Sequence, residues 1–156
     1  MTKTNVMRLL DAAGIEYETV EYEVDESDLS GAHIVKETGK DKDSVFKTLV
    51  FSGDKNGFGV CCIPVYDELD LKKTAKVFGD KKVEMLHVKD LLKTTGYIRG
   101  GCSPVGMKKQ FRTVIDETAQ LFDTIYVSGG QRGVMLGISP LSLAGYIGAD
   151  FADVTV

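Results

Sequence analysis

The sequence predicts one α+β domain over residues 1–156, with a mixed, mostly antiparallel β-sheet and short helices around it. The length is typical of a single domain, and 43% hydrophobic residues are enough for an ordinary core. Two β-prone runs, VFKTLVF and FGVCCIPV, are separated by a short turn of Gly, Asp and Asn, which is typical of a β-hairpin. Several short helical patterns end at a glycine, and no long linker or repeat divides the chain.

The N-terminal region predicts a helix, a strand and a second helix. Apolar residues recur at helical spacing over 6–13 and are followed by a glycine. Residues 15–22 alternate, carry β-branched and aromatic side chains and include three glutamates, so they predict a strand near a sheet edge. The second helix covers 32–38, with a capping serine or aspartate in the acidic loop 25–30 and a glycine at its end.

The middle region predicts a hairpin and two helices. Residues 45–51 and 58–65 are the two β-prone runs, and SGDKNG joins them. Apolar residues at helical spacing over 71–78 and 88–92 predict two short helices, each with a glycine after it.

The last third begins with a glycine-rich segment and continues with alternating strand and helix signals. A proline at the first turn and a serine cap mark its final helix. In order, we expect strands over 111–117, 125–130 and 133–138, a helical turn over 117–122 and a helix over 139–148.

The composition excludes several classes of protein. The formal net charge is −4, so the chain lacks the broad cationic surface that indiscriminate nucleic-acid binding requires. No apolar run approaches the roughly 20 residues that a membrane-spanning helix requires. Cys61 and Cys62 are adjacent, which disfavours a disulfide, and no cysteine or histidine has metal-site spacing. We therefore expect a soluble, cytoplasmic protein without a metal or other cofactor.

Lys47 is the first candidate for function, because it lies within the strongly apolar run VFKTLVF. Strict alternation puts Lys47 on one strand face with Val45, Leu49 and Phe51. A lysine among apolar neighbours must either reach water or face a cavity that holds an anionic or polar group. One interpretation is an exposed strand face with a solvated ammonium. The other is an electrostatic contact with a phosphate or carbonyl oxygen.

The glycine-rich segment GYIRGGCSPVGMKK is the second candidate. Gly100 and Gly101 permit positive φ and let a ligand approach backbone N–H groups, which can bind an anion or stabilise an oxyanion. Cys102 and Ser103 add a thiol and a hydroxyl, and Pro104 stiffens the exit. An ordinary turn between strands is the alternative, and the segment lacks the spacing of a P-loop.

The segment IYVSGGQRG is the third candidate. A strand runs into Ser128, Gly129 and Gly130, where small residues again expose backbone donors. Arg132 follows, and its guanidinium can bind a phosphate or carboxylate through two hydrogen bonds. A hairpin turn with a solvated arginine explains the same pattern.

No protein nucleophile stands out in the sequence. A catalytic thiol needs a base, and neither His33 nor His87 has a sequence reason to lie beside Cys102. No serine lies in a GxSxG motif. One group of basic side chains has two interpretations, either solvated surfaces or a basic rim that guides a nucleic-acid end. The group consists of Lys72, Lys73, Lys76, Lys81, Lys82, Lys108, Lys109 and Arg112.

Four segments together, in their order and spacing, resemble the YbaK/EbsC family of aminoacyl-tRNA deacylases. They are VFKTLVF, CIPVYDELDLKKTAKVFG, GYIRGGCSPVGMKK and IYVSGGQRG, and the resemblance covers nearly the whole chain. Within that family, the sequence is similar to the branch that acts on Cys-tRNA(Pro). The resemblance implies a mixed, barrel-like β-sheet surrounded by helices.

The resemblance also implies which residues form the site. The family's essential lysine matches Lys47, and its glycine pair facing the scissile carbonyl matches Gly100 and Gly101, so these residues would be catalytic. Arg132 would contact the tRNA end. The implied substrate-binding residues are Tyr22, Thr48, Cys102, Ser103, Pro104, Ser128, Gly129, Gly130 and Arg132.

The implied mechanism uses the thiol of the substrate. The cysteinyl thiol attacks its own ester carbonyl, the tRNA leaves with its terminal hydroxyl free, and a cysteine thiolactone then opens in water. Lys47 and backbone N–H groups would position the carbonyl and stabilise the oxyanion, so Cys102 is expected to be dispensable. The expected partners are the acceptor end of tRNA(Pro) and prolyl-tRNA synthetase.

Two alternatives stay open. A deacylase for alanine or another small residue would use the same fold and the 2′-hydroxyl of the tRNA, and the size of the pocket decides between them. A non-hydrolytic module that binds aminoacyl-tRNA ends or a nucleotide would be favoured by loss of the lysine or the glycine pair, and both are present.

Overall fold

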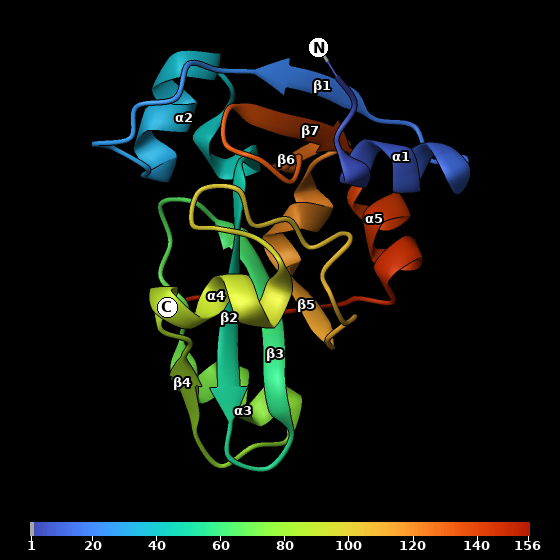
Figure 1. The fold of residues 1–156 in the computed structure, drawn as a ribbon. Coiled ribbons are helices and arrows are strands. Elements are labelled where there is room, and N and C mark those ends of the chain that lie inside the picture. The colour runs from blue at the N-terminus through green and yellow to red at the C-terminus, as the bar shows by residue number, and fades with distance from the viewer. Residues whose placement is uncertain (1) are drawn as a thin grey trace.

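The computed structural model describes residues 2–156 and consists of short helices packed around two β-sheets (Figure 1). The helices are α1 (Asn5–Ala12), α2 (Gly31–Thr38), α3 (Leu71–Phe78), α4 (Val88–Thr95) and α5 (Pro140–Ile147), with 3₁₀ turns η1 (Lys42–Ser44) and η2 (Glu117–Leu121). The strands are β1 (Glu18–Glu21), β2 (Phe46–Gly53), β3 (Gly57–Pro64), β4 (Val83–Met85), β5 (Thr113–Asp116), β6 (Ile125–Ser128), β7 (Val134–Ile138) and β8 (Asp150–Ala152).

The strand pairing confirms the α+β class and the mixed, mostly antiparallel arrangement. In the described residues, β1–β7, β6–β7, β2–β3 and β2–β4 are antiparallel, whereas β3–β5 and β5–β8 are parallel. The strands form two sheets instead of one, with the orders β1-β7-β6 and β4-β2-β3-β5-β8. The bridge between Val45 and Tyr126 joins them at the start of β2, and within residues 2–156 they do not close into a barrel.

The local signals place most elements correctly. Ser30 caps α2 by accepting a hydrogen bond from the His33 N–H, and Gly39 ends the helix with a φ of 68°. The first strand is shorter than the predicted 15–22, because only four of its residues pair with β7. The short elements η1, β4 and β8 were not predicted, since three residues show no measurable periodicity.

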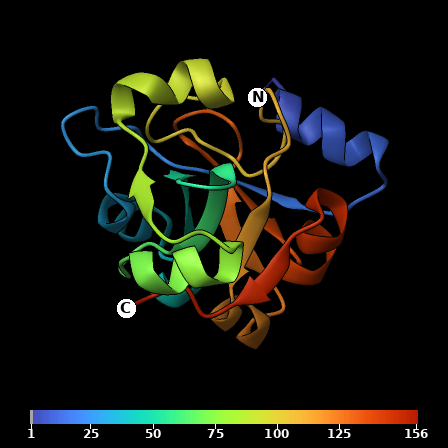
Figure 2. The ribbon, with the colours of Figure 1, turned by 90° about the horizontal axis from the view of Figure 1, so that it is seen from below.

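Helices cover both faces of the five-stranded sheet (Figures 1 and 2). Alternation along β2 sends Phe51 to the face that α3 covers and Val50 to the face of α4 and the 96–109 segment. A third core lies between the two sheets, α1 and α5, and Phe46 packs into it. The start of β2 therefore lies where these layers meet.

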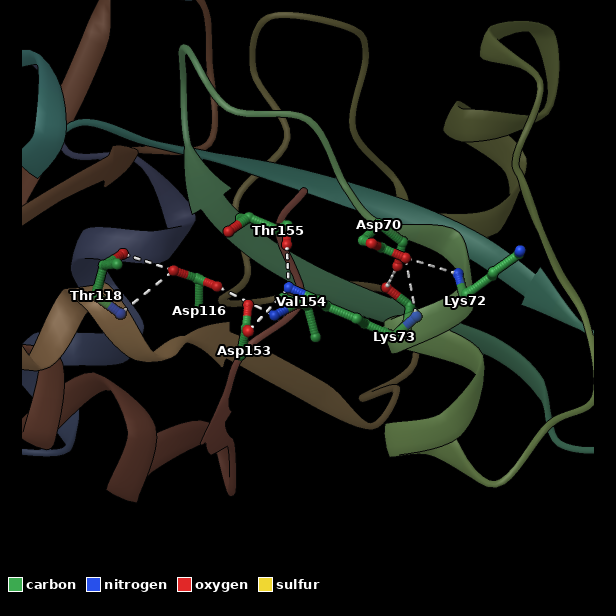
Figure 3. Close-up of polar contacts among 9 residues, drawn as sticks. Asp70, Lys72, Lys73, Asp116, Thr118, Asp153, Val154 and Thr155 are labelled. Carbon is green, nitrogen blue, oxygen red and sulfur yellow. Dashed lines mark hydrogen bonds and ion pairs between the residues drawn. The ribbon is translucent and has the colours of Figure 1, made fainter.

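The C-terminal segment is held against the sheet by a buried carboxylate and an ion pair (Figure 3). Asp116 is buried and accepts hydrogen bonds from the Val154 N–H at 3.2 Å and from the Thr118 hydroxyl at 2.6 Å. Lys73 binds Asp153 at 2.9 Å, but this pair is partly exposed. The buried carboxylate therefore contributes more to stability than the ion pair.

We expect Asp116→Ala to lower the free energy of unfolding by about 3 kcal/mol, because it leaves buried donors without an acceptor. Urea unfolding at pH 7 measures this change. Asp153→Ala is the matched control and should cost less than about 1 kcal/mol, as is usual for an exposed pair. Equal losses in the two variants would contradict this ranking.

Candidate active site

A cavity of about 470 Å³ lies where α2, β2, α4, the loop after α4 and the smaller sheet meet. Its volume is within the usual range for a small-molecule site. We call it the main cavity. Its wall consists of Leu29, Ser30, Gly31, Ile34, Phe46, Lys47, Thr48, Leu49, Val50, Val65, Met85, Leu86, Val88, Leu91, Arg99, Gly100, Cys102, Ser128 and Met135.

Lys47 lines the main cavity and is half-buried. Burial lowers the pKa of its ammonium, while the nearby carboxylates of Asp67 and Glu68 act in the opposite direction. Among the described residues, no carboxylate lies within the 4.0 Å of an ion pair with Lys47. The lysine is therefore placed in a cavity with its charge uncompensated by a direct partner, and not on a plain solvated strand face.

Successive residues of β2 line the main cavity, which strict alternation does not predict. Pairing with β4 covers only Phe51, Ser52 and Gly53, so no described strand pairs with that side of β2 at residues 47–49. Lys47, Thr48 and Leu49 therefore border an open edge, and all three line the cavity.

The turn at Ile98–Gly101 brings one of the two predicted glycines to the main cavity. The Gly101 N–H donates to the Ile98 carbonyl at 3.0 Å, and Gly100 has a φ of 86°. Gly100 and Cys102 line the cavity, whereas Gly101 is buried behind it. Within the described chain, the N–H groups of Gly100 and Cys102 make no hydrogen bond with a protein acceptor, so they are the available donors.

Gly101 has a packing role. A Cβ at this position would lie 3.1 Å from the Gln131 Cα and 3.2 Å from the Arg132 nitrogen. Because these contacts are tight and involve backbone atoms, a side chain at this position would push the turn and the loop after β6 apart by a few tenths of an ångström.

Most of the other small residues support the wall from behind. Ser103 and Pro104 are buried, and the Ser103 hydroxyl accepts a hydrogen bond from the Val105 N–H at 3.2 Å. Ser128 lines the main cavity, and its hydroxyl accepts from the Gly130 N–H at 3.2 Å. Gly129 is buried and donates to Val134, so neither it nor Gly130 forms part of the cavity wall.

Tyr22 and Arg132 lie at a second, much smaller cavity that shares Gly100, Leu29, Ser30 and Ile34 with the main one. The Tyr22 ring meets His33 edge to face, with centroids 6.4 Å apart. The Arg132 Nε donates to the Arg99 carbonyl at 2.8 Å. The structure thus brings Tyr22 and Arg132 beside the main cavity but not into its wall.

Several cavity residues were not predicted from the sequence. Arg99 lines the mouth with an exposed side chain, and Met135 lines the wall from β7. The apolar wall from Met85 to Leu91 comes from the end of β4, the link that follows it and α4. Only the position of Arg99, directly before the glycine pair, was a signal in the sequence.

The main cavity contains no activated protein nucleophile. Burial raises the pKa of Cys102 to about 12, so its thiol is protonated at neutral pH. None of the described residues in the wall is His, Asp or Glu, so the cavity offers no imidazole or carboxylate base. The cations on and after α3 and those after the glycine-rich segment do not line this cavity.

Among residues 2–156, no three His, Cys, Asp or Glu side chains gather closely enough to hold a metal ion. No helix in the same residues combines the length and apolarity needed to cross a bilayer.

The chain is an aminoacyl-tRNA editing protein by its family, and its fold agrees with that class. Residues 30–146 match the family described as the aminoacyl-tRNA editing domain, and this chain belongs to that family. Editing of an aminoacyl-tRNA is hydrolysis of its ester bond, so the family is one of deacylases.

One named relative is similar to this chain along nearly the whole length of both proteins. The chain is 48% identical over 153 residues to "Putative Cys-tRNA(Pro)/Cys-tRNA(Cys) deacylase EbsC" of Enterococcus faecalis strain V583, covering 98% of this chain and 93% of that protein.

Solved structures share the fold. The crystal structure of "a putative trans-editing enzyme for prolyl tRNA synthetase" has a TM-score of 0.85 and 22% identity, covering 100% of this chain and 99% of that one. The crystal structure of hypothetical protein APE2540 has a TM-score of 0.89 and 23% identity, covering 98% and 100%. At this level of identity the two structures support the fold alone.

Proposed function

We propose that the protein hydrolyses mischarged Cys-tRNA(Pro) in trans, with the cysteinyl thiol of the substrate as the nucleophile. The observation that carries the proposal is the main cavity itself. Its wall offers an unpaired lysine ammonium and backbone N–H donors, but no thiolate, imidazole or carboxylate to act as nucleophile or base. The family and the relative from Enterococcus faecalis support the choice of substrate.

The reaction needs two bond changes at one carbonyl carbon. The substrate sulfur bonds to the ester carbon and the carbonyl oxygen becomes an oxyanion. The C–O bond to the ribose then breaks, the ribose oxygen takes the thiol proton, and cysteine thiolactone is released. Water opens the thiolactone to free cysteine.

In this reaction the protein positions the substrate and stabilises the charge that develops on it. The Lys47 ammonium and the N–H groups of Gly100 and Cys102 stabilise the oxyanion, and the cavity holds the thiol close to the carbonyl. The low polarity of the surrounding wall strengthens these interactions. No cofactor is required.

The proposed substrate implies a protein partner and a cellular compartment. With a net charge of −4, the protein has little general affinity for RNA, and we expect prolyl-tRNA synthetase to present the mischarged acceptor end to it. Charged tRNAs are made and used in the cytoplasm, and we expect the protein to act there.

The test is deacylation of Cys-tRNA(Pro) beside Ala-tRNA(Pro) and Pro-tRNA(Pro), with and without prolyl-tRNA synthetase. Loss of cysteine alone supports the proposal. Loss of alanine instead would assign the protein to another branch of the family. No loss from any substrate would leave a binding module.

Cys102→Ala is expected to keep the deacylation rate within about threefold of wild type, because the buried thiol has a pKa of about 12 and is no nucleophile. Single-turnover rates measure the effect. Cys61→Ala is a control for removal of a buried thiol outside the cavity wall. A loss of 100-fold or more in Cys102→Ala alone would assign the attack to the enzyme.

A further inference from the structure

Arg132 makes a specific contact with the turn that carries Gly100. Its Nε donates to the Arg99 carbonyl at 2.8 Å, across the gap between the loop after β6 and the loop after α4. The turn is closed by the hydrogen bond from Gly101 to Ile98 at 3.0 Å. The guanidinium therefore binds the central peptide of a β-turn.

The orientation of that peptide is what distinguishes the common types of β-turn. A positive φ at the third residue, as Gly100 has at 86°, is the mark of a type II turn. A type I turn has the central peptide flipped by about half a turn. Because glycine tolerates both signs of φ, the sequence of the turn does not select one orientation by itself.

The hydrogen bond from Arg132 to the Arg99 carbonyl selects one of these two peptide orientations. No peptide bond among residues 2–156 is cis, and in a trans peptide the N–H points opposite to the C=O. The Arg99 carbonyl is held toward Arg132, so the Gly100 N–H points away from it. Gly100 belongs to the wall of the main cavity, and Arg132 does not.

We infer that Arg132 is a positioning residue, which holds the Arg99–Gly100 peptide so that the Gly100 N–H faces the main cavity as an oxyanion donor. This inference rests on the proposed function and gives Arg132 a role other than direct contact with the tRNA.

The surroundings of Arg132 support this role. The backbone of the Arg132 loop packs directly on Gly101, and this packing keeps the guanidinium beside the turn. Asp25 and Asp28 share the smaller cavity with Arg132, but they accept hydrogen bonds from Ser27 and Ser30. Neither carboxylate forms an ion pair with Arg132 in the described chain, so the Arg99 carbonyl is its defined partner.

Arg132→Met and Lys36→Met are the matched variants. Each removes one positive charge near Asp28, but Lys36 is exposed on α2 and lines neither cavity. We expect Arg132→Met to lower kcat for Cys-tRNA(Pro) by about 10- to 100-fold, with KM and the salt dependence of KM unchanged. Lys36→Met should keep kcat within about threefold of wild type.

Spectra of protein labelled with ¹⁵N-glycine provide a readout that does not depend on activity. The Gly100 amide resonance should shift or broaden in Arg132→Met and stay in place in Lys36→Met. If wild type deacylates no substrate, the proposed function fails, while these spectra still decide whether Arg132 orients the peptide.

Three results would overturn the inference. One is an unchanged Gly100 resonance in Arg132→Met. Another is a raised KM with unchanged kcat in Arg132→Met, together with a slope of log KM against log salt concentration that is smaller by about one. That result would show that Arg132 contacts a phosphate. The third is an equal loss of kcat in both variants, which would show that only the positive charge matters.

Discussion

Replacing Lys47 with methionine is expected to slow deacylation of Cys-tRNA(Pro) by at least about 100-fold, as is typical when one group that stabilises an oxyanion is lost. Methionine fills the space of the lysine stem but carries no charge into the main cavity. Single-turnover loss of labelled cysteine, corrected for spontaneous ester hydrolysis, measures the rate. Lys55→Met, in the exposed turn between β2 and β3, removes the same charge away from the cavity and should retain the wild-type rate.

The same variant should melt at the wild-type temperature or above it at pH 7. Burial lowers the pKa of Lys47 below its ordinary 10.5, so the folded protein binds this proton more weakly than the unfolded chain. The protonated lysine therefore destabilises the fold below its folded pKa, and this penalty disappears as the pH rises past the unfolded value. The advantage of Lys47→Met should shrink toward pH 10.5.

Two results would contradict this account of Lys47. A wild-type rate in Lys47→Met would remove the lysine from the reaction. A loss of several degrees in melting temperature would show that the lysine holds the fold together and that a slow rate reflects misfolding.

Blocking the thiol of the substrate is expected to slow deacylation by at least about 1,000-fold, because an intramolecular nucleophile held near its carbonyl contributes factors of this size or more. S-Methylcysteinyl-tRNA(Pro) tests this, since it retains the ester and the amino group but has no thiol to attack. Seryl-tRNA(Pro), with a hydroxyl in place of the thiol, should also react slowly. Single-turnover assays with each substrate and wild-type protein measure the ratios.

A terminal 2′-deoxyadenosine provides the control for the other internal nucleophile. Cys-tRNA(Pro) with this change should still be deacylated within about threefold of the normal rate, because the 2′-hydroxyl takes no part in thiol attack. A large loss with the deoxy substrate, or rapid hydrolysis of the S-methyl substrate, would contradict attack by the thiol. The first of these would assign the attack to the 2′-hydroxyl and the second to 2′-hydroxyl or water.

The helices and the hairpin could be predicted because their signals are local. Ser30 and Gly39 bound α2, and the two β-prone runs with a short turn between them form β2 and β3. The division into two sheets could not be predicted, because it depends on pairing between distant segments. β8 pairs with β5 and β1 pairs with β7, and neither partner is near in sequence.

The sequence marked candidate residues for the site, but it could not give their geometry. Lys47, Gly100 and the loop after β6 stand out because a lysine in an apolar strand and paired glycines are unusual patterns. That Gly101 packs on the backbone of the next loop while Gly100 lines the cavity depends on how two loops approach each other. Which of the paired N–H groups is available is a property of the folded turn.

The sequence by itself determined the fold class and most of the elements, since each follows from the local preferences of neighbouring residues, and it marked Lys47 and the glycine pair as candidates for the site. Only the tertiary structure decided that the edge of β2 is open at residues 47–49, and that Arg99, Met135 and the apolar wall of α4 enclose the same cavity. It also decided that Arg132 binds the turn at Gly100. The physical reason is that a cavity is the space left between elements, and its shape depends on packing between segments that are far apart in the chain.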